Sequence, residues 1–530
     1  MFYRKVKTAC RTHLKTIDST WNPLVKCGLA RASLLLLATF ITGSFLFACQ
    51  KPLPELNPGA FASTAPGKYF KIKEKAEKAD LPAKGKTALG PDNLIPPAKK
   101  LSLADLVDVA LRINPSTQVS WGQARSAAAQ WAASRGDYYP SIEGDISGMG
   151  MGGDSSSGYY GNVALSLSYL LLDFGGRAAS VESAHQALMA ANWNHNQTIQ
   201  DVLRDVPQAY YTYLGNKAKV RASESNLEEA LTSLKSTEQR KKAGVSTIAD
   251  VLQARSNADQ VRLDLVTNRG AVKISRGELA TTVGWPANAN FDVAEEPGDL
   301  PLTEMTQSTD VLIKLALGDR PDLASARAAV RQSEADLKKA DSDLWPKLTA
   351  TGNAGWSGID GNISGGDYFE SGGNINSSGV SYYGGLSLQF PLFEGFSLRN
   401  KVRAARADLE ANRAALRLKE ESVISDVWSA FYNVQTAVQQ VESSETLLIS
   451  SKESYKVSLA RYRAGVADIV ELLNAQSTLA SARAQRVQAR TDLFTFYAEL
   501  LHAIGAELPA DISNEMSISK GKREVSTNGR

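Results

Sequence analysis

Histidine, the side chain most often used for acid–base catalysis and zinc binding, is scarce in this sequence. The chain of 530 residues has four, His13, His185, His195 and His502, and no zinc-type spacing, nucleophile motif or P-loop accompanies them. The stretch GMGMGG at 148–153 fits a dinucleotide-binding glycine pattern. It leads into DSSSGYYG rather than into a helix, so it lacks the helix N-terminus that would bind a pyrophosphate. We therefore predict a protein that is not an enzyme and that binds no metal and no cofactor.

Cysteine offers a different chemistry, because all three cysteines lie within the first 49 residues. Basic residues are followed by the apolar run ASLLLLATFITGSFLFA at 32–48 and then by Cys49. The run is short for a transmembrane helix and has the build of a secretory signal. Its end, LFAC, resembles the cleavage site of bacterial lipoproteins, in which the cysteine becomes acylated. We predict a signal peptide at 1–48 and lipid on Cys49; an ordinary buried cysteine and an uncleaved anchor are the alternatives.

The segments that flank the body of the chain are poor in core-forming residues. Residues 49–100 are rich in Pro, Lys, Ala and Glu and read as a lipidated N-terminal linker, and 513–530 read as a disordered tail. By analogy with other lipoproteins, Gln50 after the cysteine favours sorting to the outer membrane. The net charge of +3 gives no indication of a nucleic-acid partner.

The body of the chain contains one unit twice. RKKAGVSTIADVLQAR at 240–255 recurs as RYRAGVADIVELLNAQ at 461–476, and similar matches extend in the same order on both sides. We predict two structural repeats, 101–306 and 307–512. Each contains a leading helix, two strands, a long helix, a tip turn, a returning helix and, in the first, a link to the second.

The strands and helices of each unit follow from periodicity. Leading helices are predicted at 116–135 and 322–344, and heptad-like apolar spacing predicts coiled-coil helices near 177–243 and 398–464. Between them, alternating segments predict two strands of about ten residues on either side of a Gly/Ser loop. These loops are expected at 145–161 and at 357–381.

The long helices must end at Gly244 and Gly465, because glycine there allows a left-handed cap. Thr247 with Asp250, and Asp468 with Glu471, have the spacing of capping boxes for helices that return to Gly284 and Gly505. Each unit therefore forms a helical hairpin with a tight tip.

The predicted strands alternate apolar and small polar residues and have aromatic residues at their ends, a pattern typical of outer-membrane barrels. Four strands cannot close a barrel, and open sheet edges are not tolerated in lipid. An eight-stranded barrel is filled by its own side chains, so a trimer is the smallest closed assembly that conducts. The alternative is an ordinary sheet on a soluble coiled-coil protein.

This order of parts resembles the TolC-like outer-membrane efflux and secretion channel family, and in particular its lipoprotein branch. The resemblance rests on LSLADLVDVALRINP, on LLLDFGGR and PLFEGFSLR at the strand-to-helix junctions, and on the two tips. It implies an α+β membrane protein. Its four strands contribute to a trimeric transmembrane β-barrel that continues into a long periplasmic α-helical coiled-coil barrel.

The resemblance also implies function and partners. It implies a passive efflux duct for drugs or toxic compounds in the outer membrane of a Gram-negative bacterium. The duct works as a homotrimer in contact with outer-membrane lipid, with a periplasmic adaptor and an inner-membrane transporter of the RND, ABC or MFS type. The positions that match the family's adaptor-contacting tip are Gly244, Val245, Gly465 and Val466, and those that match its aperture are Asp250 and Glu471.

Several alternatives remain open from the sequence. Asp250 and Glu471 could serve only as helix caps, and closure of the tip could use Lys242 or Arg463 as partners of the acids. The exported material could be a protein secreted by a type I system. The chain could also be a structural coiled-coil lipoprotein without a pore, whereas a periplasmic enzyme has no residue constellation to support it.

Overall fold

The computed structural model describes residues 61–71, 100–153, 156–294, 308–363 and 373–506. The predicted signal peptide 1–48, the lipidation site Cys49, most of the linker 49–100 and the tail 513–530 lie outside these residues.

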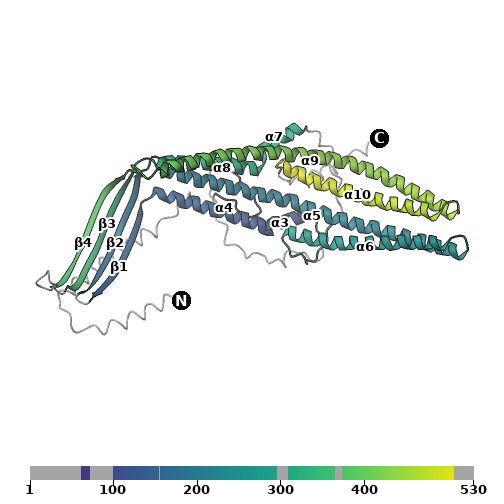
Figure 1. The fold of residues 1–530 in the computed structure, drawn as a ribbon, viewed down its shortest axis with the longest axis horizontal. Helices are drawn as coiled ribbons and strands as arrows, with labels where there is room; N and C mark the ends of the chain where they lie inside the picture. Colours follow the sequence, from purple (N-terminus) through teal and green to yellow (C-terminus); the bar gives the residue numbers. More distant parts are fainter. Residues whose placement is uncertain (1–60, 72–99, 154–155, 295–307, 364–372, 507–530) are drawn as a thin grey trace, which may run out of the picture. The chain divides into compact units, whose positions relative to one another are not determined.

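Apart from the short η5, which is found only in the first half, the two halves of the chain contain the same kinds of elements in the same order (Figure 1). The first half consists of α3 (Leu103–Ile113), α4 (Pro115–Ser134), η5 (Arg135–Tyr138), β1 (Ser141–Gly153), β2 (Ser156–Leu172), α5 (Gly176–Lys242) and α6 (Ile248–Val283). The second consists of α7 (Thr309–Asp319), α8 (Pro321–Ser342), β3 (Lys347–Ile363), β4 (Gly373–Gln389), α9 (Ser397–Arg463) and α10 (Ile469–Ala503). The α+β architecture predicted from the sequence is confirmed.

Local sequence accounts for where the helices begin. Ser102 caps α3 in a capping box with Asp105, while Pro115 and Pro321 stand in the first turns of α4 and α8, where a missing N–H costs nothing. The long helices α5 and α9 have 67 residues each, which corresponds to about 100 Å. Helix α5 continues through Pro207 as one helix.

The four strands form one antiparallel sheet in the order β1-β2-β3-β4. They have 13 to 17 residues and extend through most of 145–161 and 357–381. The prediction of Gly/Ser loops over these two ranges was therefore wrong for most of their length. Glycines of the expected loops pair with each other in the ladder. A Cβ on Gly361 would lie 2.9 Å from the Cα of Gly158, its partner. Hydrogen bonding between strands outweighs the low strand propensity of these residues.

The register separates the sheet into an apolar and a polar face. The pairs Ile146–Val163 and Val163–Trp356 place large apolar residues on one face, and Trp356 pairs in turn with Val380. Val380 is 76% exposed and Ile146 is 82% exposed in the single chain. Residues an odd number of positions away along the same strand, among them Glu143, Asp145, Ser166 and Asn353, therefore lie on the opposite face.

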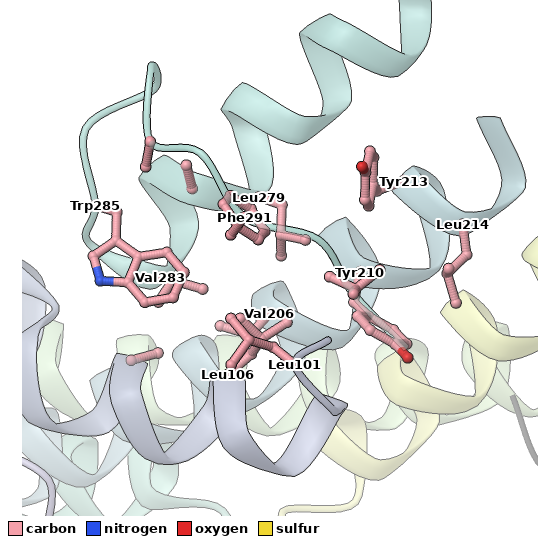
Figure 2. Packing of buried hydrophobic residues seen from close by; sticks show 14 of the residues in the cluster. Leu101, Leu106, Val206, Tyr210, Tyr213, Leu214, Leu279, Val283, Trp285 and Phe291 are labelled. Carbon is pink, nitrogen blue, oxygen red and sulfur yellow. The ribbon is translucent and has the colours of Figure 1, made fainter. Parts of the chain in front are cut away.

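The helices bury two main apolar clusters. The first joins α3, α5, α6 and the segment that follows α6 (Figure 2), and Leu106, Val206 and Leu279 are fully buried in it. Trp285 and Phe291 pack edge to face at 5.3 Å. The second cluster joins α7, α8, α9 and α10, for example through Ala316, Leu323, Val427, Val434, Leu493 and Leu500.

The two long helices differ in their neighbours. Helix α5 packs against α4 and α6 of its own repeat and against α8 and α10 of the second repeat. Helix α9 packs mainly against α7, α8 and α10, all from its own repeat. Apolar side chains remain exposed along α9, including Leu418, Trp428, Ile449 and Val457, and along α6, including Leu252, Leu263, Val266 and Ile274.

Within the described ranges, no helix is both long enough and apolar enough to cross a membrane.

Candidate functional site at the helix tips

The first tip joins α5 to α6 through a left-handed glycine. Gly244 has φ +77°, its N–H donates to the carbonyl of Lys241 at 2.9 Å, and the N–H of Val245 donates to that of Arg240 at 2.9 Å. These are the two hydrogen bonds of a Schellman cap. No atom lies within 4 Å of a Cβ placed on Gly244, so the backbone conformation rather than lack of room requires glycine there.

The second tip, between α9 and α10, repeats this geometry. Gly465 also has φ +77°, and its N–H donates to the carbonyl of Tyr462 at 3.1 Å. The N–H of Val466 donates to the carbonyl of Arg461 at 3.1 Å. Val245 and Val466 are 62% and 67% exposed, so each tip presents an apolar side chain to solvent.

Asp250 completes the capping box predicted for α6. Its Oδ2 accepts hydrogen bonds from the Thr247 N–H at 2.7 Å and from the Ser246 hydroxyl at 2.8 Å, and its own N–H donates to Thr247 Oγ1 at 3.2 Å. The hydrogen bond from the Thr247 backbone, followed by that from Ser246, lowers the pKa of Asp250. The carboxylate is nevertheless close to the surface.

Glu471 behaves differently from the prediction. The Asp468 side chain caps α10 by accepting the Glu471 N–H at 2.8 Å, but Glu471 does not return a bond to the Asp468 backbone. Its carboxylate instead lies 3.5 Å from Nε of Arg461. The capping box expected at this tip is therefore only half formed, because the longer Glu side chain reaches a cation across the turn.

The two hairpins are joined by Arg240 and Tyr462. Arg240 Nη1 donates to the Tyr462 carbonyl at 2.7 Å, and its guanidinium lies 4.7 Å from the centroid of the Tyr462 ring. The Tyr462 hydroxyl is 3.0 Å from Thr237 Oγ1. Near the acids the cations are thus Arg240 and Arg461, two residues before the expected Lys242 and Arg463.

Further polar contacts connect α5 to α10 along the hairpins. Arg483 binds Glu229 with two nitrogens, at 3.0 and 2.8 Å, a geometry that matches the planar carboxylate. Gln476 Nε2 donates to Ser233 Oγ at 3.0 Å and is buried. A small apolar cluster surrounds these contacts; it contains Ala254, Tyr455, Tyr462, Ile469, Leu472, Ala475 and Leu479. The hairpins of one chain therefore form one packed unit at their tips.

The structure places the six predicted tip residues at the two turns and at the starts of the returning helices. The contacts of Arg240 with Tyr462 and of Arg483 with Glu229 were not anticipated. One available signal was that Arg240 and Arg461 occupy the same place in the repeated motif. Among the described residues, no group of three or more His, Cys, Asp or Glu side chains could hold a metal ion. The site therefore consists of two rigid turns with exposed apolar side chains and with charged residues close by.

Comparison with known proteins identifies related chains. The profile of the family described as "Outer membrane efflux protein" matches residues 106–285 and 312–506. Protein CyaE of Bordetella pertussis is 27% identical over 424 residues, which cover 77% of this chain and 86% of CyaE. The antibiotic efflux pump outer membrane protein ArpC of Pseudomonas putida is 23% identical, over 76% of this chain and 83% of ArpC.

Solved structures share the fold. The Campylobacter jejuni CmeC outer membrane channel superposes with a TM-score of 0.67 at 18% identity, over 78% of this chain and 88% of CmeC. The outer-membrane channel OprN gives a TM-score of 0.66 at 23% identity, over 76% of this chain and 90% of OprN. CmeC and OprN are described as outer-membrane channels, and ArpC as an outer membrane protein of an efflux pump.

Proposed function

This chain belongs to the outer membrane efflux protein family, and we propose that it is the outer-membrane duct of a tripartite efflux system. It provides a passive path for small toxic molecules from the periplasm to the exterior. The sequence contains no P-loop, and we propose that the energy comes from another component of the system. The observation that carries the proposal is the four-stranded sheet, which has an exposed apolar face and two open edges.

The sheet supports a closed oligomer in a membrane. Strands β1 and β4 are the edges, and their outer backbone groups have no strand partner within the described part of the chain. In lipid these groups must be paired, which a second copy achieves when its β1 joins β4 of the first. Three copies supply twelve strands, enough for a barrel with an open interior. The apolar face then meets lipid and the polar face, with Glu143 and Asp145, lines the passage.

The helices support the same assembly. Helix α5 is covered by α8 and α10 of the second repeat. Within the described ranges, the main neighbours of α9 include no helix of the first repeat, so the positions equivalent to α8 and α10 around α9 are not filled by its own chain. The repeat relationship assigns α4 and α6 of a neighbouring copy to that place. Both α9 and α6 carry exposed apolar side chains, as this interface requires.

The tips are the proposed contact with the rest of the pump. Gly244, Val245, Gly465 and Val466 form the two rigid, exposed turns that an adaptor would meet, and Asp250 and Glu471 are the acids proposed to surround the aperture. The bond from Arg240 to the Tyr462 carbonyl holds the two hairpins of one chain together. We propose that this contact contributes to the closed state.

The names of two relatives favour efflux as the type of transport. ArpC is named as an antibiotic efflux pump protein, and TtgC, also of Pseudomonas putida, as a toluene efflux pump protein. The partners are a periplasmic adaptor and an inner-membrane transporter, and lipid on Cys49 is proposed to anchor the chain in the outer membrane.

Conductance in a planar lipid bilayer tests the duct. The purified protein is expected to produce discrete single-channel currents, whereas a structural lipoprotein without a pore produces none. In cells, Val245→Cys or Val466→Cys should crosslink to a periplasmic adaptor. Gly270→Cys, on α6 away from the tip, is the matched control that should not. Loss of antibiotic resistance on deletion supports efflux, and loss of a secreted protein with unchanged resistance identifies secretion instead.

A further inference from the structure

Residues 61–71, here called the strap, bind to α4 and α5 through side chains of those helices. The Asn196 amide makes two hydrogen bonds to the backbone of Phe70, accepting its N–H at 2.6 Å and donating to its carbonyl at 2.9 Å. Asn192 Nδ2 donates to the Phe61 carbonyl at 2.9 Å. The backbone of the strap is thus held at both ends by two amides one helical turn apart.

The strap is also packed closely against the helices. Trp121 Nε1 donates to the Ser63 carbonyl at 2.9 Å. The Phe61 ring meets Trp131 edge to face at 4.5 Å. A Cβ on Gly67 would lie 2.5 Å from the Leu111 carbonyl oxygen, so the strap approaches α3 as closely as glycine allows. Together these contacts form a docking site for the strap on α3, α4 and α5.

His195 lies between the two amides on α5 and is completely buried. Its Nδ1 is 2.9 Å from Ser120 Oγ on α4, and its Nε2 is fully buried on the side of the strap, where the Lys68 backbone hydrogen-bonds to the ring. Burial lowers the pKa of His195, and the backbone of Lys68 in the strap opposes part of this effect. The imidazole therefore sits beneath the strap, and the Lys68 backbone offsets only part of the cost of charging it there.

We propose that protonation of His195 releases the strap. A buried imidazolium must be paired or hydrated. Hydration is reached most easily by moving the strap, which is held by side-chain hydrogen bonds, rather than by separating long packed helices.

The surrounding charges support this mechanism. Within the described residues no carboxylate forms an ion pair with His195. The strap contributes Lys68, Tyr69 and Lys71, and α4 contributes Arg125; none of these is an anion at neutral pH. Several acids around α5 have cationic partners of their own: Asp108 pairs with Arg112 on α3, Asp322 with Arg320 and Lys419 at α8, and Asp201 of α5 itself with Arg204 and His502.

The sign of the pH dependence follows from the lowered pKa. The docked form binds fewer protons than the released form once the pH falls below 6.5, the ordinary value for His195. Docking is therefore strongest above that pH and weakens as the pH falls toward the docked-state pKa. One titrating group changes the ratio of docked to released strap by up to about tenfold per pH unit.

Hydrogen–deuterium exchange of the full-length assembled protein tests the proposal. Peptides covering 61–71 are compared at pH 7.5 and pH 5.5, after normalising for the intrinsic exchange rate of each amide. We expect protection of the Phe70 amide to fall at least several-fold at the lower pH in the natural protein. His195→Gln, which cannot be protonated, should abolish this difference. His185→Gln, at a partly exposed histidine beside Glu182, should keep it.

A second variant keeps the proposal testable if His195→Gln does not assemble. Asn196→Ala removes two hydrogen bonds from the strap but leaves His195 in place, so release should reach its midpoint at a higher pH than in the natural protein. Equal protection of 61–71 at both pH values in the natural protein would overturn the proposal. So would a pH dependence that survives in His195→Gln. Neither result depends on whether the protein is a channel.

Discussion

The guanidinium of Arg240 lies over the ring of Tyr462 and also donates to the carbonyl of that residue, at 2.7 Å. Arg240 comes from the end of α5 and Tyr462 from the end of α9, so one side chain caps the partner helix and joins the two hairpins. The equivalent cation of the second repeat, Arg461, binds an acid of its own turn instead. The repeats are therefore alike in backbone and different in how their tips are held.

Replacement of Arg240 tests the tip contact. Arg240→Ala removes a hydrogen bond to a carbonyl and a cation–π contact, each of which contributes about 1 kcal/mol. We expect the hairpins to separate more often, giving a larger or more frequent open current in planar bilayers. Arg461→Ala is the matched control, because its partner Glu471 lies in the same hairpin. Currents indistinguishable from those of the natural protein would show that Arg240 does not contribute to closure.

Gly465 tests the requirement for a left-handed turn. Gly465→Val places a β-branched residue at φ +77°, which costs about 1–2 kcal/mol locally. The substituted tip should change shape, and resistance to exported compounds should fall more than the thermal midpoint does. Gly270→Ala, inside α6 with open space around its Cβ, should instead stabilise the protein by about 0.5–1 kcal/mol. An unchanged resistance profile in Gly465→Val would argue against a role for this tip.

Asp250 and Glu471 should differ in their effect on stability. Asp250→Asn weakens the capping box of α6, whereas Glu471→Gln loses only an exposed pair of about 0–1 kcal/mol. Since the pKa of Asp250 is lowered from 3.8, its carboxylate stabilises the fold above that pH and the contribution disappears as the pH falls through the folded-state value. The difference in thermal midpoint between Asp250→Asn and the natural protein should therefore shrink in acid.

The same two acids can be tested as aperture residues. The double variant Asp250→Asn, Glu471→Gln should lower the preference of the channel for cations, as measured by the reversal potential in a salt gradient. Its matched control is the pair of exposed helix acids Glu224 and Glu334, changed to Gln in the same way. An identical reversal potential in the double variant and the natural protein would leave Asp250 and Glu471 with local structural roles alone.

Asp322 is expected to contribute more to the stability of the fold than an exposed acid such as Asp108. It contacts the buried Arg320 at 2.6 Å and Lys419 at 2.9 Å, and these cations outweigh burial and lower its pKa to about 2. Asp322→Ala should destabilise this region by about 2–4 kcal/mol, because Arg320 loses a buried partner. Asp108→Ala, in an exposed pair with Arg112, should cost less than about 1 kcal/mol. Similar losses of thermal stability in the two variants would refute this assignment.

The pH dependence of Asp322 follows the sign of its shift. The folded-state pKa lies below the ordinary 3.8, so the stabilisation is complete above about pH 4 and is lost progressively as the pH falls toward 2. Acid unfolding of the natural protein should begin in this window. Unfolding of Asp322→Ala should show a weaker dependence on pH there.

Local patterns predicted most of the helical architecture. The long helices were expected at 177–243 and 398–464 and are found at Gly176–Lys242 and Ser397–Arg463. Their ends can be predicted from a few neighbouring residues, because the left-handed glycine and the cap at Thr247 or Asp468 form short, recognisable sequence patterns. The Gly/Ser segments were misjudged because their strands form through pairing with distant segments, which local propensity does not include.

The side-chain contacts between repeats could not be predicted for a related reason. Arg240 and Tyr462 are 222 positions apart, and Asn196 binds Phe70 across 126 positions. Sequence periodicity identifies which face of a helix is buried, but it does not say which partner covers that face. Such contacts depend on how whole helices are aligned along one another.

The unequal surroundings of α5 and α9 have a genetic consequence. Because α5 is enclosed by helices of its own chain, a subunit with a disruptive substitution there should fail to fold before it can assemble with other subunits. A second, intact gene in the same cell should then compensate. Helix α9, by contrast, relies on a neighbouring copy for part of its cover in the proposed trimer. A subunit altered on that face should fold, assemble with normal subunits and make the mixed trimer defective. Its defect should therefore be dominant.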